Sequence, residues 1–241
     1  MVTIKIAGIP IGIDARFEYT EKYVSEFLSD EAPLFTVSAT DAEMDKECEI
    51  SGVRLPYQYV ENVVMYRKIA ERLCDFSAVV FHGAILEYDG RAYAVTAHSG
   101  VGKTTHTRLW LSEFGDKVRI LNGDKPIFRM IDGIPYVCST PWKGKEGYGY
   151  NAMRPLGGIA FLARGAENCS RRVDVDDVSM RFMNQIYISK TNVLSISRSM
   201  RIADEILSKV PLYELECNMD PEAAHVAFRA FVEGKTTSFA E

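Results

Sequence analysis

Hydrophobic and polar residues alternate in short runs at the start of the chain and then recur at helical spacing. The runs over residues 2–7 and 34–38 alternate as half-buried strands do, and residues 21–28 have the pattern of a helix. Over residues 56–74 apolar side chains return every three or four positions, which predicts an amphipathic helix that packs onto a sheet. We therefore expect residues 1–75 to form a small α+β region packed on the core of the chain.

The middle of the chain holds a series of short apolar runs with the length and composition of strands. The turns Asp89-Gly90 and Asp132-Gly133 each join two of these runs, which predicts antiparallel hairpins. Residues 104–114 have the pattern of a helix. The predicted strands are 78–81, 84–88, 91–96, 118–121, 127–130 and 136–138. These runs predict a mixed, largely antiparallel sheet.

Residues 139–158 have neither a helical nor a strand period, and they contain five glycines and two prolines. A long irregular segment inside a compact domain is typical of a functional loop. The elements predicted after it are a strand over 158–163, helices over 176–186 and 193–207, a strand over 212–216 and a helix after Pro221. The sequence thus predicts an α/β fold in which helices flank a mixed sheet, with residues 76–241 as one domain.

A glycine-rich segment at residues 97–104 lies between a predicted strand and a predicted helix. Glycines let backbone N–H groups point at phosphate oxygens, and a helix N-terminus favours negative charge, so this is the context of a P-loop. The pattern G-x-x-x-x-G-K-[ST] begins with glycine, whereas this segment begins with Ala97. Lys103 would reach the terminal phosphates and Thr104 would bind magnesium; a glycine turn without function is the alternative. The residues predicted to bind ATP with Mg²⁺ are Ser99, Gly100, Val101, Gly102, Lys103, Thr104 and Thr105.

Phosphoryl transfer also needs an acidic group near the metal or the attacking hydroxyl. Asp124 follows a predicted strand, whose end would bring its carboxylate beside the glycine-rich segment as a base or metal ligand. His82 follows another strand and could tune Asp124 or move a proton. The alternatives are a turn-forming aspartate and a buried histidine bonded to the backbone. We expect His98 and His106 to be contact or surface residues.

The irregular segment contains several charged and aromatic side chains that suit a lid over phosphates or a clamp for an anionic substrate. Trp142, Lys143 and Lys145 are the predicted substrate contacts there, with Arg154 as a second phosphate contact. Glu146 is a further candidate magnesium ligand. A solvated loop without a specific role is the alternative.

Composition restricts the classes of partner. The chain has 241 residues, of which 47% are hydrophobic and 25% charged, and a net charge of -5, so it has no general attraction to nucleic acid or anionic lipid. Its five cysteines are scattered without a C-x-x-C pair, which predicts reduced thiols. The sequence has no apolar run long enough for a membrane span and no secretory leader, which predicts a cytoplasmic protein without nucleic-acid or membrane partners.

The order of these motifs over residues 78–165 resembles the HPr kinase/phosphorylase family, which with the phosphoenolpyruvate carboxykinases places its phosphate loop within a mixed sheet. The resemblance implies that His82 is the active-site histidine, Lys103 the phosphate lysine, Thr104 the metal hydroxyl and Asp124 the acidic base.

Two departures mark the chain as a divergent relative. The family carries two adjacent acids where this chain has Gly123-Asp124-Lys125, and a Ser-Glu where it has Thr104-Thr105. The Thr-Thr pair resembles the carboxykinase loop, but 241 residues are too few for a two-lobed carboxykinase.

The motifs together predict an ATP-dependent kinase that transfers the γ-phosphoryl group to a hydroxyl of a protein, a peptide or a small metabolite. A phosphatase or phosphorylase could use the same site in the reverse direction. A nucleotide-binding sensor or assembly factor is the alternative from another class, which the missing second acid favours. A structural protein with an incidental glycine loop is the third.

Overall fold

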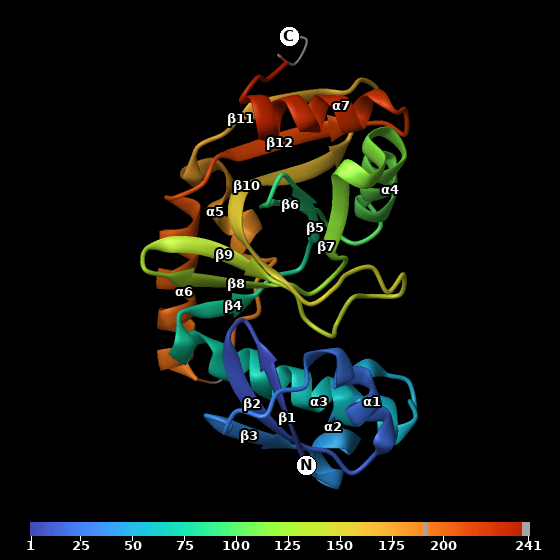
Figure 1. The fold of residues 1–241 in the computed structure, drawn as a ribbon, viewed down its shortest axis with the longest axis vertical. Helices are drawn as coiled ribbons and strands as arrows, with labels where there is room; N and C mark the ends of the chain where they lie inside the picture. The colour runs from blue at the N-terminus through green and yellow to red at the C-terminus, as the bar shows by residue number, and fades with distance from the viewer. Residues whose placement is uncertain (190–191, 238–241) are drawn as a thin grey trace.

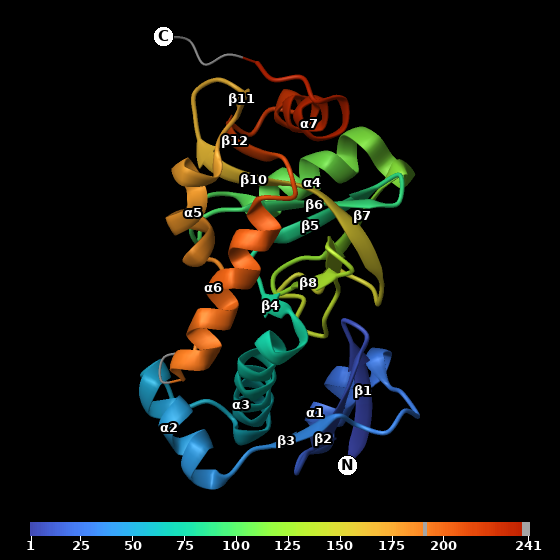
Figure 2. The ribbon, with the colours of Figure 1, turned by 90° about the vertical axis from the view of Figure 1, so that its left-hand side faces the viewer.

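The chain forms a small three-stranded sheet with helices at its N-terminal end and a large mixed sheet in the remainder (Figures 1 and 2). The structure is a computed structural model, and it describes residues 1–189 and 192–237. Within these residues, no helix has both the length and the apolar character that crossing a bilayer requires.

The small sheet has its strands in the order in which they occur along the chain: β1 (Val2–Ile6), β2 (Ile9–Asp14) and β3 (Phe35–Ser38). β2 is antiparallel to β1 and parallel to β3. β2 is absent from the sequence-based expectations, because Pro10 argues against a strand there. Pro10 is the second residue of β2, and the apolar residues around it are buried in the core of this region.

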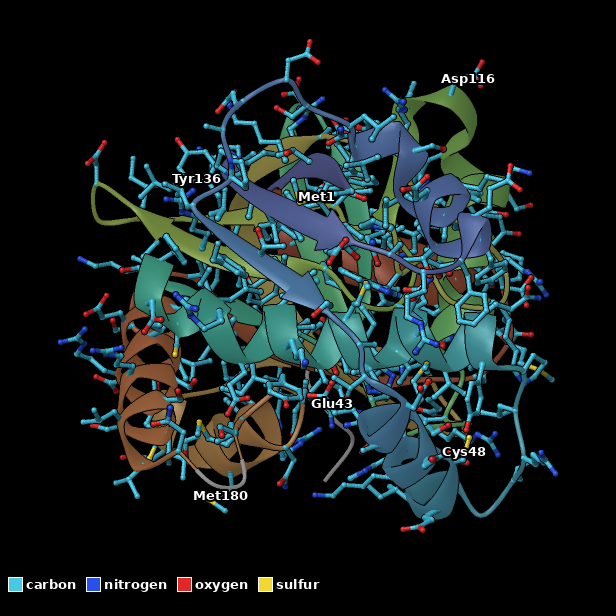
Figure 3. The ribbon with its side chains drawn as sticks, turned by 90° about the horizontal axis from the view of Figure 1, so that it is seen from below. Met1, Glu43, Cys48, Asp116, Tyr136 and Met180 are labelled. Atoms are coloured by element: carbon cyan, nitrogen blue, oxygen red, sulfur yellow. The ribbon has the colours of Figure 1, made fainter. Side chains whose placement is uncertain are left out.

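Three helices accompany the small sheet: α1 (Glu18–Val24), α2 (Asp41–Ser51) and α3 (Tyr57–Arg72). The polar helix α2 was not predicted, since Met44 is its only buried residue. It begins at a capping box, in which the Glu43 N–H donates to Thr40 Oγ1 over 3.3 Å and the Thr40 N–H donates to Glu43 Oε2 over 2.9 Å. Figure 3 shows α2, with Glu43 and Cys48, beside α3 and the three strands.

Helix α3 joins the two parts of the molecule. Its buried Met65 and Ile69 belong to one hydrophobic cluster with the isoleucines of β1 and β2. The same cluster includes Val80, Ile127 and Cys138 from the large sheet. The N-terminal region therefore shares a core with the larger sheet.

The large sheet has the strand order β4-β8-β9-β10-β6-β5-β7, with β12 beside β10 and β11 beside β12. Its strands are β4 (Ala78–Val80), β5 (Ala84–Tyr88), β6 (Arg91–Thr96), β7 (Val118–Asn122), β8 (Ile127–Ile131), β9 (Ile134–Cys138), β10 (Met153–Arg164), β11 (Cys169–Arg172) and β12 (Leu212–Cys217). β10 is parallel to β6 and β12, and the other pairs are antiparallel. The expected mixed, largely antiparallel α/β architecture is confirmed.

The long strand β10 curls the sheet. Its first residues pair with β9, the middle with β6 and the last with β12. It begins at Met153, so the irregular segment is shorter than the expected 139–158 and ends at residue 152.

Helices cover both faces of the strands around β6 (Figure 2). The helices on one face are α4 (Lys103–Phe114) and α7 (Glu222–Phe228), and those on the other are α5 (Val175–Met183) and α6 (Val193–Leu207). Along β6, Ala92 and Ala94 belong to the core with α5 and α6, whereas Tyr93 and Val95 belong to the core with α4 and α7. This double burial fixes β6, whose end carries the glycine-rich segment.

Candidate active site

The glycine-rich segment runs from the end of β6 at Thr96 to the first residue of α4. Gly100 has φ +81° and Gly102 has φ +128°, conformations that side chains disfavour. A Cβ added at either glycine would meet no heavy atom within 4 Å, so the space beside both glycines is open. Open space beside two glycines ahead of a helix N-terminus suits an anion.

Lys103 reaches back across the segment. Its Nζ donates a hydrogen bond to the Ala97 carbonyl oxygen over 2.9 Å. Burial lowers the pKa of Lys103, and the Asp124 carboxylate opposes this effect. The ammonium is therefore near Asp124 and partly desolvated. Thr104 and Thr105, the next residues of α4, are exposed.

Arg164, at the end of β10, binds two carbonyl groups of the glycine-rich segment. Its Nη2 donates to the Gly100 carbonyl over 2.6 Å, and its Nε donates to the Val101 carbonyl over 3.1 Å. Two bonds from one planar guanidinium fix the direction of both peptide groups. Arg164 was not among the predicted site residues, because nothing local distinguishes an arginine at a strand end that is over 60 positions from its partners.

Asp124 and His82 meet, as predicted. His82 Nε2 lies 3.4 Å from Asp124 Oδ1, and Lys125 Nζ lies 3.6 Å from the same oxygen. Burial would raise the pKa of Asp124, but the hydrogen bond from His82 and the charge of Lys125 outweigh it and hold this pKa below its ordinary value. Asp124 is therefore an ionised carboxylate at neutral pH.

Backbone contacts bring this pair to the end of β6. Thr96 Oγ1, directly before the glycine-rich segment, donates to the His82 carbonyl over 2.8 Å. The Gly83 N–H donates to the Asp124 carbonyl over 3.1 Å. His82 is thus held between the turn that carries Asp124 and the strand that leads into the segment.

Asn122 shapes the turn that carries Asp124, and the sequence analysis gave it no role. Its Oδ1 accepts the backbone N–H groups of Asp124 and Lys125, each over 2.9 Å. Its Nδ2 donates to the Thr140 carbonyl over 3.2 Å. Asn122 is completely buried, so these bonds are shielded from water. The position directly after a predicted strand was the available signal, since asparagine there favours such a turn.

The irregular segment 139–152 packs over the same turn. The Gly123 N–H donates to the Tyr148 carbonyl over 3.0 Å, and the Lys125 N–H donates to the Trp142 carbonyl over 3.2 Å. A Cβ at position 123 would lie 3.0 Å from the Lys143 carbonyl oxygen, so a second acid there would press against the segment. Gly144 has φ +77°, and a Cβ there would lie 2.9 Å from Asp124 Cβ. Both glycines permit this close packing.

The predicted substrate contacts in this segment already have protein partners. The Trp142 ring packs on Tyr66, with 4.9 Å between ring centroids, and its Nε1 donates to Asn62 Oδ1 over 2.9 Å. Lys143 forms an ion pair with Glu26. The structure therefore gives Trp142 and Lys143 packing roles between the segment and the N-terminal region.

Glu146 and Lys145, the other two candidates in the irregular segment, lie in different surroundings. Glu146, the candidate metal ligand, forms an ion pair with Arg108 of α4 at 2.6 Å. Lys145 is exposed. The segment thus extends from the Asp124 turn to helix α4, with Lys145 on its outer side.

Arg154 is not near the glycine-rich segment. Its Nε lies 2.6 Å from Glu87 Oε1. The register pairs Leu156 with Ala92 and Phe161 with Thr96, so Arg154 is about 20 Å along β10 from the end of β6. Arg154 serves to pair a buried carboxylate, and we do not retain it as a phosphate contact.

Replacing Arg154 by methionine is therefore expected to lower the free energy of unfolding by about 2 kcal/mol, because Glu87 would remain buried without its cation. Urea unfolding measures this loss. Arg201→Met is the matched control, because its ion pair with Glu205 is exposed and long, at 3.9 Å. Equal effects of the two variants would contradict the structural role of Arg154.

His106, expected to be a contact or surface residue, is not on the surface, because its side chain is buried. It lies one helical turn before Trp110, and its Nε2 accepts the Trp110 Nε1–H over 3.1 Å. Residues four positions apart share a helix face, and here that face packs on the sheet. Burial lowers the pKa of His106 to about 4.

This burial predicts a pH dependence of stability. The unfolded histidine takes up a proton below its ordinary pKa of 6.5, whereas the folded one does so only near 4. The unfolded state binds more protons in between, so stability falls as pH drops from 6.5 towards 4, by about 2 kcal/mol from pH 7 to pH 5. His106→Gln keeps an acceptor for Trp110 without titrating, so urea unfolding of this variant should show a decline smaller by that amount. Identical declines would contradict the assignment.

A cavity of about 400 Å³ borders the glycine-rich segment at the ends of β10 and β12. It is lined by Gly100, Val101, Gly102, Thr105, His106, Leu162, Ala163, Arg164, Gly165, Cys217, Asn218 and Met219. Its volume is within the range of about 300–1,000 Å³ that small-molecule sites occupy. Among residues 1–189 and 192–237, no group of three His, Cys, Asp or Glu side chains is arranged to hold a metal.

No protein-family model matches this sequence, and no curated protein matches it either. Among solved structures, the fold is similar to that of the Hpr(Ser) kinase/phosphatase from Coxiella burnetii. The match covers 64% of this chain and 94% of that one, with a TM-score of 0.37 and 7% sequence identity. The similarity is a distant one of fold, and the function is argued from the site itself.

Proposed function

We propose that this chain is an ATP-dependent kinase that transfers the γ-phosphoryl group to a hydroxyl. The observation that carries the proposal is the arrangement at the end of β6. An open glycine-rich segment with Lys103 and Thr104 at a helix N-terminus lies close to the ionised Asp124. Phosphate binding and a nearby carboxylate are the two requirements of phosphoryl transfer.

The residues present fit a nucleotide and magnesium. The segment acts as a P-loop, whose N–H groups bind phosphate oxygens while Lys103 leaves the Ala97 carbonyl for the terminal phosphates. Magnesium needs one or two carboxylates in addition to phosphates, so Thr104 and Asp124 suffice without a dedicated metal cluster. When bound, the metal neutralises charge on the phosphates.

Asp124 is suited to receive the proton of the acceptor hydroxyl. Its low pKa keeps the carboxylate ionised, and His82 holds one of its oxygens. Asn122 fixes the turn beneath it, so the carboxylate is oriented before substrate binds. Arg164 orients the P-loop peptides in the same way.

The cavity beside the P-loop is the proposed place for the nucleoside. Val101 and Thr105 line it, directly next to the phosphate-binding part of the segment. Much of its wall is glycine and apolar side chain from the ends of β10 and β12. Such a wall accepts a planar base and gives modest discrimination between ATP and GTP.

A nucleotide-binding sensor is the second candidate, and one observation favours it. Position 123 is a glycine against which the irregular segment packs, so a second acid there would have to displace the segment. A sensor would bind nucleotide and transfer nothing. A phosphorylase would use the same residues, with phosphate as the attacking group.

Thermal unfolding with Mg²⁺ and ATP, GTP, ADP or pyrophosphate tests the proposal. A ligand at 100 times its Kd stabilises the fold by about 2.7 kcal/mol, which raises Tm by several degrees. Transfer of label from γ-labelled ATP then separates a kinase from a sensor. If no triphosphate or pyrophosphate raises Tm, the proposal is wrong.

A further inference from the structure

A second cavity, of about 240 Å³, borders the Asp124 turn. Four parts of the chain line it: α3, the end of β4, the Asp124 turn and residues 184–187. The lining residues are Tyr66, Val80, Phe81, His82, Lys125, Asn184, Gln185, Ile186 and Tyr187. None of these residues belongs to the P-loop or lines the nucleoside cavity, and two of them, His82 and Lys125, contact Asp124.

Backbone hydrogen bonds hold the walls of this cavity together. The His82 N–H donates to the Gln185 carbonyl over 2.7 Å, and the Tyr187 N–H donates to the Val80 carbonyl over 2.9 Å. Residues 184–187 therefore pair with the segment that carries His82. The cavity is a built feature of the fold, beside the carboxylate proposed to receive a proton.

The charges that line the cavity have one sign. Lys125 contributes an ammonium and His82 an imidazole, whereas the lining contains no carboxylate. Asp124 is adjacent to the lining: its side chain is 33% exposed and lies 3.4 Å from His82 and 3.6 Å from Lys125. An anionic group entering the cavity would meet the Lys125 ammonium, with the His82 imidazole beside it.

Gln185 supplies a second, independent sign of a ligand. Its side chain is 9% exposed, and its Oε1 is buried without a hydrogen-bond partner among the described residues. An unpaired buried acceptor costs about 1–3 kcal/mol, which a donor from a ligand would recover. Gln185 also lines a small cavity with Ala97 and His98 of the P-loop, so it lies between the two sites.

We infer that this cavity binds the phosphoryl acceptor and that the acceptor is a small anion with at least two hydroxyls, a hydroxy-carboxylate or a sugar phosphate. The inference rests on the proposed function. The anionic group binds Lys125 beside His82, one hydroxyl donates to Gln185 Oε1, and the other reaches the adjacent Asp124. The volume is below the range of about 300–1,000 Å³ typical of drug-sized ligands, which favours a small molecule over a peptide segment.

The transfer step balances within these groups. The acceptor oxygen forms a bond to the γ-phosphorus as the bond from that phosphorus to the β,γ-bridging oxygen breaks. The hydroxyl proton passes to the Asp124 carboxylate. The products are the nucleoside diphosphate and a phosphate ester of the acceptor.

The test compares probes of equal carbon length: glycerate, glycerol 3-phosphate and neutral glycerol, with a blocked serine peptide as the macromolecular alternative. Trp142 reports occupancy, because its ring packs on Tyr66 in the cavity wall. We expect at least one of the two anions to change tryptophan fluorescence saturably without nucleotide, and glycerol not to do so. Trp142→Phe should abolish the signal. With labelled ATP and Mg²⁺, transfer to that anion should exceed transfer to glycerol at least tenfold.

Lys125→Met should remove this preference, so that transfer to the anion and to glycerol proceeds at about the same rate. Lys46→Met, at an exposed position of α2, should leave the preference unchanged. A general effect of Lys125 on Asp124 would lower both rates equally and would overturn the assignment. So would preferential transfer to the peptide, or the absence of binding by both anions while nucleotide raises Tm. If no nucleotide raises Tm, the proposed function is wrong. Saturable anion binding reported by Trp142 would then still show an anion site in this cavity, and its absence would overturn the inference as well.

Discussion

Asparagine in place of Asp124 is expected to lower kcat for phosphoryl transfer by about 100- to 10,000-fold, the contribution of a positioned general base. The amide cannot take up the hydroxyl proton and is a poorer magnesium ligand. It preserves the shape of the side chain and can still accept a bond from His82. The glycine-rich segment does not depend on this side chain, so nucleotide without metal should bind with little change.

The measurement is labelled phosphoryl transfer together with the Tm shift given by ATP. Asp116→Asn is the matched control, because Asp116 is exposed at the far end of α4 and is visible at the edge of the molecule in Figure 3. Slow hydrolysis that is the same in the native protein and the Asp124 variant would show that the carboxylate has no catalytic part. The sensor would then be the better assignment.

The parts of the site that the sequence predicted are those with a local signal. The glycine-rich segment carries its pattern within eight residues, between a strand and a helix that both formed. Asp124 and His82 each follow a short apolar strand, and both strands are present. Strand ends gather polar groups at one edge of a sheet, so their meeting followed from the order of elements.

The parts that the sequence did not predict depend on contacts between distant residues. Arg164 reaches Gly100 across 64 positions, and Trp142 reaches Asn62 across 80. Arg154 and Trp142 both look like ligand contacts in a glycine-rich stretch, and only the register of β10 and the packing of α3 assign them to other partners.

The elements missed in the N-terminal region have a different cause. β2 contains a proline that weakens the strand signal, and α2 is so polar that its periodicity is weak. Burial in the core of the N-terminal region makes β2 a strand in spite of its proline, and a local capping box stabilises the start of α2. A capping box is readable from Thr40 and Glu43, so α2 could have been predicted.

Methionine in place of Lys103 is expected to remove the Tm increase given by ATP with Mg²⁺ and to lower phosphoryl transfer by about 100- to 1,000-fold, the effect of losing one well-placed donor to developing charge. The free energy of unfolding without nucleotide should change by only about 1 kcal/mol. The variant loses the bond to the Ala97 carbonyl, but it also relieves an ammonium whose pKa is lowered by burial.

The contrast between these two readouts separates a phosphate lysine from a structural one. A lysine that merely closes the glycine-rich segment onto Ala97 would affect the stability of the free protein and leave the nucleotide-induced Tm shift intact. Lys117→Met, at an exposed lysine before β7, controls for the loss of one positive charge. If Lys103→Met and Lys117→Met keep equal Tm shifts, the segment does not bind triphosphate. Asp124 would then have no phosphoryl group to act upon, although the ammonium lies near its carboxylate.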